Sequence, residues 1–182
     1  MSHNNYKSKI ITALLVSEQH IRGLAKQVGT NQTTSARKVA ELHKDNIVDF
    51  RNEGKNKVVR IKKTLEAKHY VYMVEAQKVL DLLKHYPFLR RIIDQIQRNQ
   101  KIRLAVLFGS YAKGSAHKES DIDIYIDTQA RNVKDAVELI DSKIRVKIGM
   151  YDRESILIKE IEKNHVLIKG VEEYYKKNKF FE

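Results

Sequence analysis

Short helical patterns of apolar residues alternate with polar turns in the first part of the chain. Two such patterns fill residues 8–28, and Gly29 ends the second. Residues 30–34 supply N-cap candidates for a third helix. The inward positions expected on that helix are Ala36, Val39, Ala40 and Leu42. Alternating runs at 47–50 and 58–62 flank a basic tip that contains glycine, which predicts a β-hairpin.

The pattern changes in the second part of the chain. Residues 64–86 form a long helical pattern, and Pro87, the only proline, marks its end. Helices are expected at 88–98, 132–139, 155–163 and after Gly170, and strands at 102–108, 121–127, 144–150 and 166–169. Strands that alternate with helices predict an α/β domain. The whole chain is thus expected to be α+β, with domains at 1–63 and 87–182 joined by a linker or dimerisation helix at 64–86.

The order helix, helix, turn, helix, hairpin resembles a winged helix-turn-helix domain, and residues 21–48 carry the likeness. The resemblance implies a third helix in the major groove of DNA and a basic hairpin against phosphates. On the outer face of that helix we expect DNA contacts from Gln32, Thr33, Ser35, Arg37 and Lys38. The phosphate contacts expected elsewhere are Arg22, Lys26, Arg51, Lys55 and Lys57. A three-helix domain that packs only against protein is the alternative.

The distribution of charge favours a nucleic-acid partner for the front of the chain. The 182 residues include 35 Lys and Arg against 23 Asp and Glu, a net charge of +12. Residues 1–99 hold 19 basic and 9 acidic side chains, a balance of +10, and the remainder holds 16 and 14. Double-stranded DNA is the expected partner. Solvated charge on a lysine-rich helical protein, and RNA binding, are the alternatives.

The composition excludes several other classes of protein. No cysteine is present, which excludes disulfide scaffolds, thiolate nucleophiles and Cys-containing zinc sites, and fits a reducing compartment. The longest apolar run, residues 10–16, is far shorter than the roughly 20 residues that span a bilayer. We therefore expect a cytoplasmic protein without membrane association.

The residues most informative about chemistry lie between 107 and 127. Gly109 and Gly114 are five positions apart, but Ser115 and Ala116 follow Gly114, so the lysine of a P-loop is missing. What is present is a Gly-Ser pair at 109–110, ten further residues and then Asp121-Ile122-Asp123. The pair ends one expected strand, and the two aspartates open the next.

This pattern resembles the signature of the polymerase-beta-like nucleotidyltransferases, particularly the minimal nucleotidyltransferases, over residues 87–170. The resemblance implies a mixed sheet and transfer of a nucleoside monophosphate from a nucleoside triphosphate to an acceptor hydroxyl, with Mg²⁺ as cofactor and ATP as the expected donor. It makes Asp121 and Asp123 the catalytic and metal-binding residues. The phosphate-binding residues expected are Gly109, Ser110, Lys113 and Ser120.

The chemistry of the residues agrees with that implication. Strand residues alternate between faces, so Asp121 and Asp123 share one side and lie about 6 to 7 Å apart. Mg²⁺ prefers one or two carboxylates together with phosphate oxygens. Gly109 allows close approach of a phosphate, and the Ser110 hydroxyl can donate a hydrogen bond to it. An ordinary strand with its polar face in water is the alternative.

One position departs from the family pattern. Active members of the superfamily carry a third carboxylate on a following strand, and the matching strand here, 144–150, presents Arg145, Lys147 and Gly149 on its polar side. Lys147 therefore stands where the acid is expected. Either two carboxylates and one Mg²⁺ suffice, or the expected strand register is wrong, or catalysis has been lost.

Two functions follow from these features. The first is a DNA-binding nucleotidyltransferase; because some minimal nucleotidyltransferases are antitoxins that adenylylate a helical ribonuclease, such a toxin is a candidate partner. The second is a winged-helix transcription regulator whose transferase fold is catalytically degenerate. Lys147 favours the second, and the intact Gly-Ser and Asp-x-Asp pattern favours the first.

Overall fold

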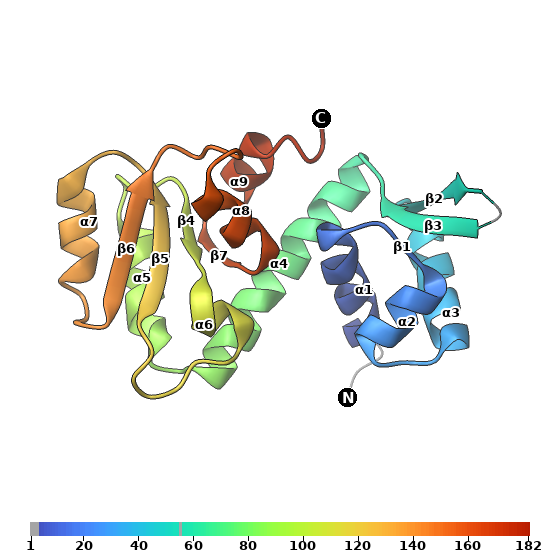
Figure 1. Cartoon of the computed structure of the whole chain (residues 1–182), viewed down its shortest axis with the longest axis horizontal. Helices are drawn as coiled ribbons and strands as arrows, with labels where there is room; N and C mark the ends of the chain where they lie inside the picture. The colour runs from blue at the N-terminus through green and yellow to red at the C-terminus, as the bar shows by residue number, and fades with distance from the viewer. Residues whose placement is uncertain (1–3, 55) are drawn as a thin grey trace. The chain divides into compact units, whose positions relative to one another are not determined.

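The protein divides into two compact units. The computed structural model describes residues 4–54 and 56–182, so Lys55, one of the predicted phosphate contacts, lies outside the described residues. The first unit extends to Val74 and includes Phe180–Glu182, and the second is Glu75–Lys179. The division falls within the long helix α4, Leu65–His85 (Figure 1). In the described part of the chain, every helix is too short or too polar to cross a membrane.

Before α4, the described residues of the N-terminal unit form three helices and a small antiparallel sheet. Its elements in order are α1 (Asn4–Val16), β1 (Gln19–His20), α2 (Ile21–Val28), α3 (Gln32–Lys44), β2 (Val48–Glu53) and β3 (Asn56–Ile61). The strand order is β1-β3-β2. The predicted helices and hairpin are confirmed, and their order is like that of a winged helix-turn-helix domain. Strand β1 was not predicted, because two residues are too few to form a pattern.

A short turn joins α2 to α3 and is closed by local interactions. Gly29 ends α2 with φ 74°, a left-handed conformation that favours glycine. Asn31 then caps α3, since its side-chain oxygen accepts a hydrogen bond of 2.7 Å from the Thr34 backbone N–H. The turn predicted between these two helices is confirmed, and Asn31 sets the start of α3.

The face that α3 buries differs from the prediction at three positions. Ser35 and Lys38, expected on the outer face, are only 0% and 7% exposed, whereas Ala40, expected inside, is exposed, so the inward placement of Ala40 is wrong. The placement of Ser35 and Lys38 follows from packing of α3 on α1 and α2, which turns the line Ser35, Val39 and Leu42 inward. Lys38 tolerates this position because its aliphatic stem is covered while its ammonium donates to the Glu41 carboxylate at 2.9 Å. The prediction of outward-facing Ser35 and Lys38 is therefore wrong.

Helix α4 ends where proline requires it. Its last residue, His85, lies two positions before Pro87, as predicted. Val71, Val74 and Leu82 are buried, but other apolar residues of the helix are exposed. The large exposed ones are Leu65, Met73 and Leu80.

The C-terminal unit contains a four-stranded mixed sheet. Its elements in order are α5 (Leu89–Arg98), β4 (Ala105–Leu107), α6 (Gly109–Lys113), β5 (Ile122–Asp127), α7 (Arg131–Glu138), β6 (Ile144–Gly149), α8 (Ile156–Lys163), β7 (Val166–Lys169) and α9 (Val171–Lys177). The strand order is β6-β5-β4-β7. Strands β5 and β6 are parallel, and the other neighbours are antiparallel. The mixed sheet is confirmed.

Two details of this unit correct the prediction. Strand β4 has three residues rather than the seven expected over 102–108, and helix α6 lies between the strands expected at 102–108 and 121–127, where no helix was expected. The helix was not predicted because five residues are too few to display helical periodicity and because glycines stand at both of its ends.

The core of this unit determines which sheet face is free for chemistry. Ile122, Ile124 and Ile126 of β5 belong to a buried cluster with Ile92 of α5 and Val133 of α7. Because strand residues alternate, Asp123, Tyr125 and Asp127 point to the opposite face. We call this face, with the facing residues of β6, the polar face of β5 and β6.

Candidate active site

Gly109 begins the site at the turn between β4 and α6. Its φ is +70°, and a β-carbon there would overlap Asp123 Oδ2. The backbone N–H of Phe108 donates a hydrogen bond of 3.0 Å to the Asp123 carbonyl oxygen, which fixes the turn against β5. The sequence predicted a close approach at Gly109; in the structure the group that approaches is the Asp123 carboxylate.

The two aspartates differ in their surroundings. Asp121 lies just before β5, is half exposed and forms an ion pair of 3.4 Å with Arg145. Asp123 is less exposed and makes no salt bridge with any residue that the structure describes. Burial raises the pKa of Asp123, the negative charge of Asp121 raises it further, and Lys147 and Arg145 partly oppose these effects. Asp123 is thus a carboxylate whose charge is incompletely compensated.

The register of β6 places basic rather than acidic residues beside these carboxylates. Asp123 is level with Arg145, Tyr125 with Lys147, and Asp127 with Gly149. Partners in parallel strands present their side chains to the same face, so Arg145 and Lys147 are on the polar face of β5 and β6. The prediction that Arg145 and Lys147 lie on the polar side of their strand is confirmed. Within residues 4–54 and 56–182, no three His, Asp or Glu side chains are arranged to hold a metal ion.

The far end of the polar face is occupied by structural contacts. Asp127 forms an ion pair of 2.9 Å with Lys177 of α9 and accepts a hydrogen bond of 2.9 Å from the Tyr151 backbone N–H. The Tyr125 hydroxyl donates to the Gly149 carbonyl oxygen at 3.0 Å, and burial raises the pKa of Tyr125. Lys177 and Tyr151 carried no motif in the sequence, and Asp127 is not available to a ligand.

The residues predicted to bind phosphate differ in their surroundings and in the contacts that they make. Ser110 is the second residue of α6, directly after Gly109. Lys113 ends that helix in an ion pair of 3.3 Å with Glu160 of α8. Ser120 is buried, and its hydroxyl oxygen accepts a hydrogen bond of 2.9 Å from the His117 backbone N–H. The structure brings Gly109 together with Asp123, whereas Lys113 and Ser120 have partners within the protein.

The predicted DNA-binding side chains of the N-terminal unit are only partly available. Gln32, Thr33 and Arg37 are exposed on α3. Arg22 and Lys26 are exposed on α2, and the Lys57 ammonium lies 6.0 Å from the centre of the Phe50 ring. Arg51 is paired with Glu18 at 3.0 Å, so part of its charge is compensated.

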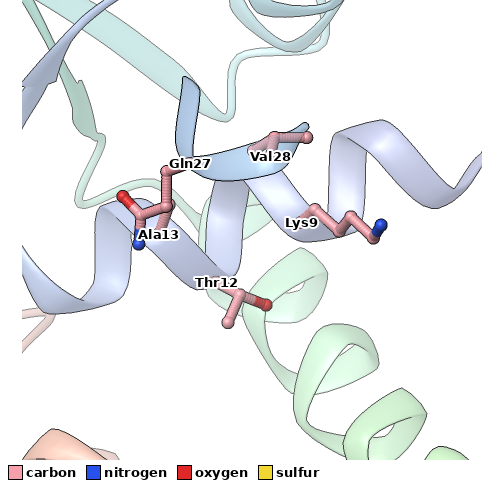
Figure 2. A pocket seen from close by; sticks show the side chains of 5 residues that line it. All are labelled: Lys9, Thr12, Ala13, Gln27 and Val28. Carbon is pink, nitrogen blue, oxygen red and sulfur yellow. The ribbon is translucent and has the colours of Figure 1, made fainter. Parts of the chain in front are cut away.

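A small open cavity of about 250 Å³ lies on α1 and α2 and contains none of these residues (Figure 2). Lys9, Thr12, Ala13, Gln27 and Val28 line it. The Thr12 hydroxyl donates to the Ser8 carbonyl oxygen, and the Gln27 side chain accepts from Gln19. Two of its polar side chains are thus already engaged within the protein.

Comparison with known proteins decides the class of the C-terminal unit. The family model described as polymerase beta, nucleotidyltransferase, matches residues 90–173. Residues 90–173 form a polymerase beta nucleotidyltransferase domain. The matched segment contains α6, β5 and β6, and therefore Gly109, Asp121, Asp123 and Lys147.

The other comparisons add little. A solved winged helix-turn-helix DNA-binding domain from Mycobacterium bovis, described as homodimeric and as part of a possible ArsR-family transcriptional regulator, is 24% identical to this chain. The match covers 43% of this chain and 74% of that one, with a TM-score of 0.37. No curated protein matches the chain.

Proposed function

We propose that the C-terminal nucleotidyltransferase domain transfers a nucleoside monophosphate from a nucleoside triphosphate, with ATP as the donor, to an acceptor hydroxyl. The observation that carries this proposal is the position of Asp123: a partly buried carboxylate without a salt bridge among the described residues, set against a glycine that has no room for a side chain. Such a carboxylate favours a cation as its partner.

The residues of the site fit one divalent cation rather than two. Asp121 and Asp123 are the two carboxylates that would hold Mg²⁺, and the described residues provide no third one beside them. When bound, Mg²⁺ would neutralise charge that develops on the phosphates during transfer.

The protein's own groups would influence the reaction in two ways. Arg145 would compete with a cation for Asp121, because the two side chains are paired in this structure. The backbone of Gly109 lies against Asp123, and the N–H groups of this turn together with the Ser110 hydroxyl would orient the triphosphate. In the transfer, the acceptor oxygen bonds to the α-phosphorus, pyrophosphate leaves, and the hydroxyl proton passes to solvent.

For the N-terminal unit we propose binding of double-stranded DNA. Gln32 and Thr33 are exposed at the start of α3, the helix that enters the major groove in winged helix-turn-helix domains, and Arg37 follows one turn later. Lys57 on the hairpin is exposed and would contact a phosphate. Ser35 and Lys38 are left out of this proposal because they are buried.

Two partners remain part of the proposal. A homodimer is supported by α4, which leaves Leu65, Met73 and Leu80 exposed. A helical ribonuclease-type toxin would supply the acceptor hydroxyl. A gene for such a ribonuclease next to the gene of this protein would support this assignment.

The second candidate function is a DNA-binding regulator whose transferase domain is inactive. The observation that favours it is the balance of charge at the site, where Arg145 and Lys147 share a face with Asp121 and Asp123. A domain in that state would bind a nucleotide or a second copy of the chain without transferring anything.

Transfer itself distinguishes the two functions. The full chain is incubated with Mg²⁺ and ATP labelled at the α-phosphate, together with DNA, RNA and a candidate helical ribonuclease. Label attached to an acceptor by the wild type, absent with Asp123→Asn and retained with Asp94→Asn, an exposed aspartate of α5, supports the enzyme. Equal labelling by wild type and Asp123→Asn would rule out a role for the site.

A further inference from the structure

Lys147 is a cation without a direct partner on the polar face of β5 and β6. Its strand neighbour Val146 is buried on the other side of the sheet. Lys147 makes no hydrogen bond or ion pair with any residue in the ranges 4–54 and 56–182. The sequence marked Lys147 only as a departure from a family pattern.

The other basic side chains near this face are engaged. Arg145 pairs with Asp121 and donates to the Ser142 carbonyl oxygen at 2.8 Å. Lys113 pairs with Glu160, and Lys177 pairs with Asp127. The Lys143 ammonium donates to the Lys118 carbonyl oxygen. Lys147 is therefore the basic side chain of this group that can meet a ligand without first losing a contact.

The position of Lys147 suits an anion that a cation would hold beside Asp123. Lys147 is level with Tyr125, and Tyr125 is two residues beyond Asp123 on the same face. Two residues along a strand span about 6 to 7 Å, and neighbouring strands lie about 4.8 Å apart, distances that a lysine side chain bridges. An ammonium on a flexible stem binds phosphate oxygens as a point charge and needs no fixed orientation.

The balance of charge defines the kind of anion. The two carboxylates Asp121 and Asp123 and the two cations Arg145 and Lys147 together carry no net charge, so a monoanion would gain little from this face. A triphosphate bound with one divalent cation adds more negative than positive charge, and an ammonium nearby would compensate part of the excess.

We propose that Lys147 binds the triphosphate of the nucleotide directly, at the phosphates that leave as pyrophosphate. This inference rests on the proposed function, since it requires that a nucleoside triphosphate binds at Asp123. It assigns to Lys147 a binding role in place of the interpretation that it marks a lost site.

Equilibrium binding to the full-length protein tests this role. ATP with Mg²⁺ and AMP are titrated against wild type, Lys147→Ala, Lys147→Arg and Lys101→Ala, an exposed lysine between α5 and β4. Lys147→Ala is expected to weaken ATP binding roughly 10- to 100-fold, as for loss of one charge-assisted hydrogen bond, and to leave AMP binding unchanged. Lys147→Arg should retain most of the affinity, and Lys101→Ala all of it. Unchanged melting temperatures establish that the variants are folded.

The outcomes separate this inference from the function on which it rests. If Lys147→Ala binds ATP as tightly as wild type while Asp123→Asn loses Mg²⁺-dependent binding, the inference is wrong and the proposed function stands. An equal loss of ATP and AMP affinity in Lys147→Ala would also overturn it, because the contact would then lie outside the leaving phosphates. If the wild type binds no ATP, both proposals fail.

Discussion

The backbone of Gly109 lies against the carboxylate of Asp123, and a β-carbon at Gly109 would overlap Asp123 Oδ2. The two residues come from different elements, the turn after β4 and the strand β5, so the glycine is needed to bring the turn this close. This single contact joins the two halves of the Gly-Ser and Asp-x-Asp pattern in space.

Replacement of Gly109 by alanine should therefore lower the free energy of unfolding by more than the backbone strain of a positive φ alone would. Gly114 has the same φ of +70°, but a β-carbon at Gly114 would have no atom within 4 Å, which makes Gly114→Ala the matched control. We expect Gly114→Ala to lower the free energy of unfolding by about 1 to 2 kcal/mol and Gly109→Ala to lower it further. Urea denaturation measures both. Equal losses would contradict the close contact between Gly109 and Asp123.

The burial of Lys38 gives a sharp test of the DNA-binding face. Arg37→Ala should relax sequence preference, because Arg37 is exposed on α3, whereas Lys38→Met should leave DNA affinity unchanged, because Lys38 is buried. Lys57→Ala should weaken binding to all sequences and lower the salt slope by about one unit. Binding of full-length protein to operator and unrelated DNA at several salt concentrations distinguishes these effects. A loss with Lys38→Met equal to that with Arg37→Ala would contradict the assigned face.

The ion pair between Asp127 and Lys177 should stabilise the C-terminal unit. Asp127 and Lys177 have side chains 9% and 25% exposed, so Lys177→Met leaves a largely buried carboxylate without its cation. We expect a loss of about 2 kcal/mol in the free energy of unfolding, less than for a fully buried pair. Arg98→Met removes an exposed pair with Asp94 and should cost less than about 0.5 kcal/mol. Similar losses in chemical denaturation would show that Asp127 is well solvated.

His165 should make the protein less stable in mild acid. Burial lowers the pKa of His165 and the Lys78 charge lowers it further, while Glu75, the hydrogen bond to the Ile161 carbonyl and Glu162 oppose the shift. An unfolded histidine binds a proton below a pH of about 6.5, whereas the folded one remains neutral to a lower pH. Protons therefore favour the unfolded chain, and the free energy of unfolding should decrease as pH falls below about 6.5.

The variant His165→Gln should reduce this pH dependence. The free energy of unfolding is measured between about pH 5 and 8 for wild type, His165→Gln and His85→Gln, an exposed histidine of α4. The slope below a pH of about 6.5 should be smaller in His165→Gln and unchanged in His85→Gln. Identical slopes in all three proteins would exclude His165 as the source.

Much of the fold was accessible from local sequence features. The helices of the N-terminal unit, the end of α4 before Pro87, and the strands β5, β6 and β7 follow from periodicity, caps and breakers, which act over a few neighbouring residues. Helix α6 was missed because its five residues are shorter than the patterns that reveal a helix. The burial of Ser35 was missed because a small polar residue is compatible with either face of a helix.

The sequence by itself determined the two folds and the spacing of Gly109, Asp121 and Asp123, because these depend on residue types at fixed local intervals. It also determined that Lys147 lies on the polar side of its strand, since strand alternation assigns faces without a structure. Only the tertiary structure decided that Arg145 holds Asp121, that Lys177 neutralises Asp127, and that Lys147 has no direct partner among the described residues. These relationships join separate elements, and the packing of those elements, rather than any local pattern, sets the distances between their charges.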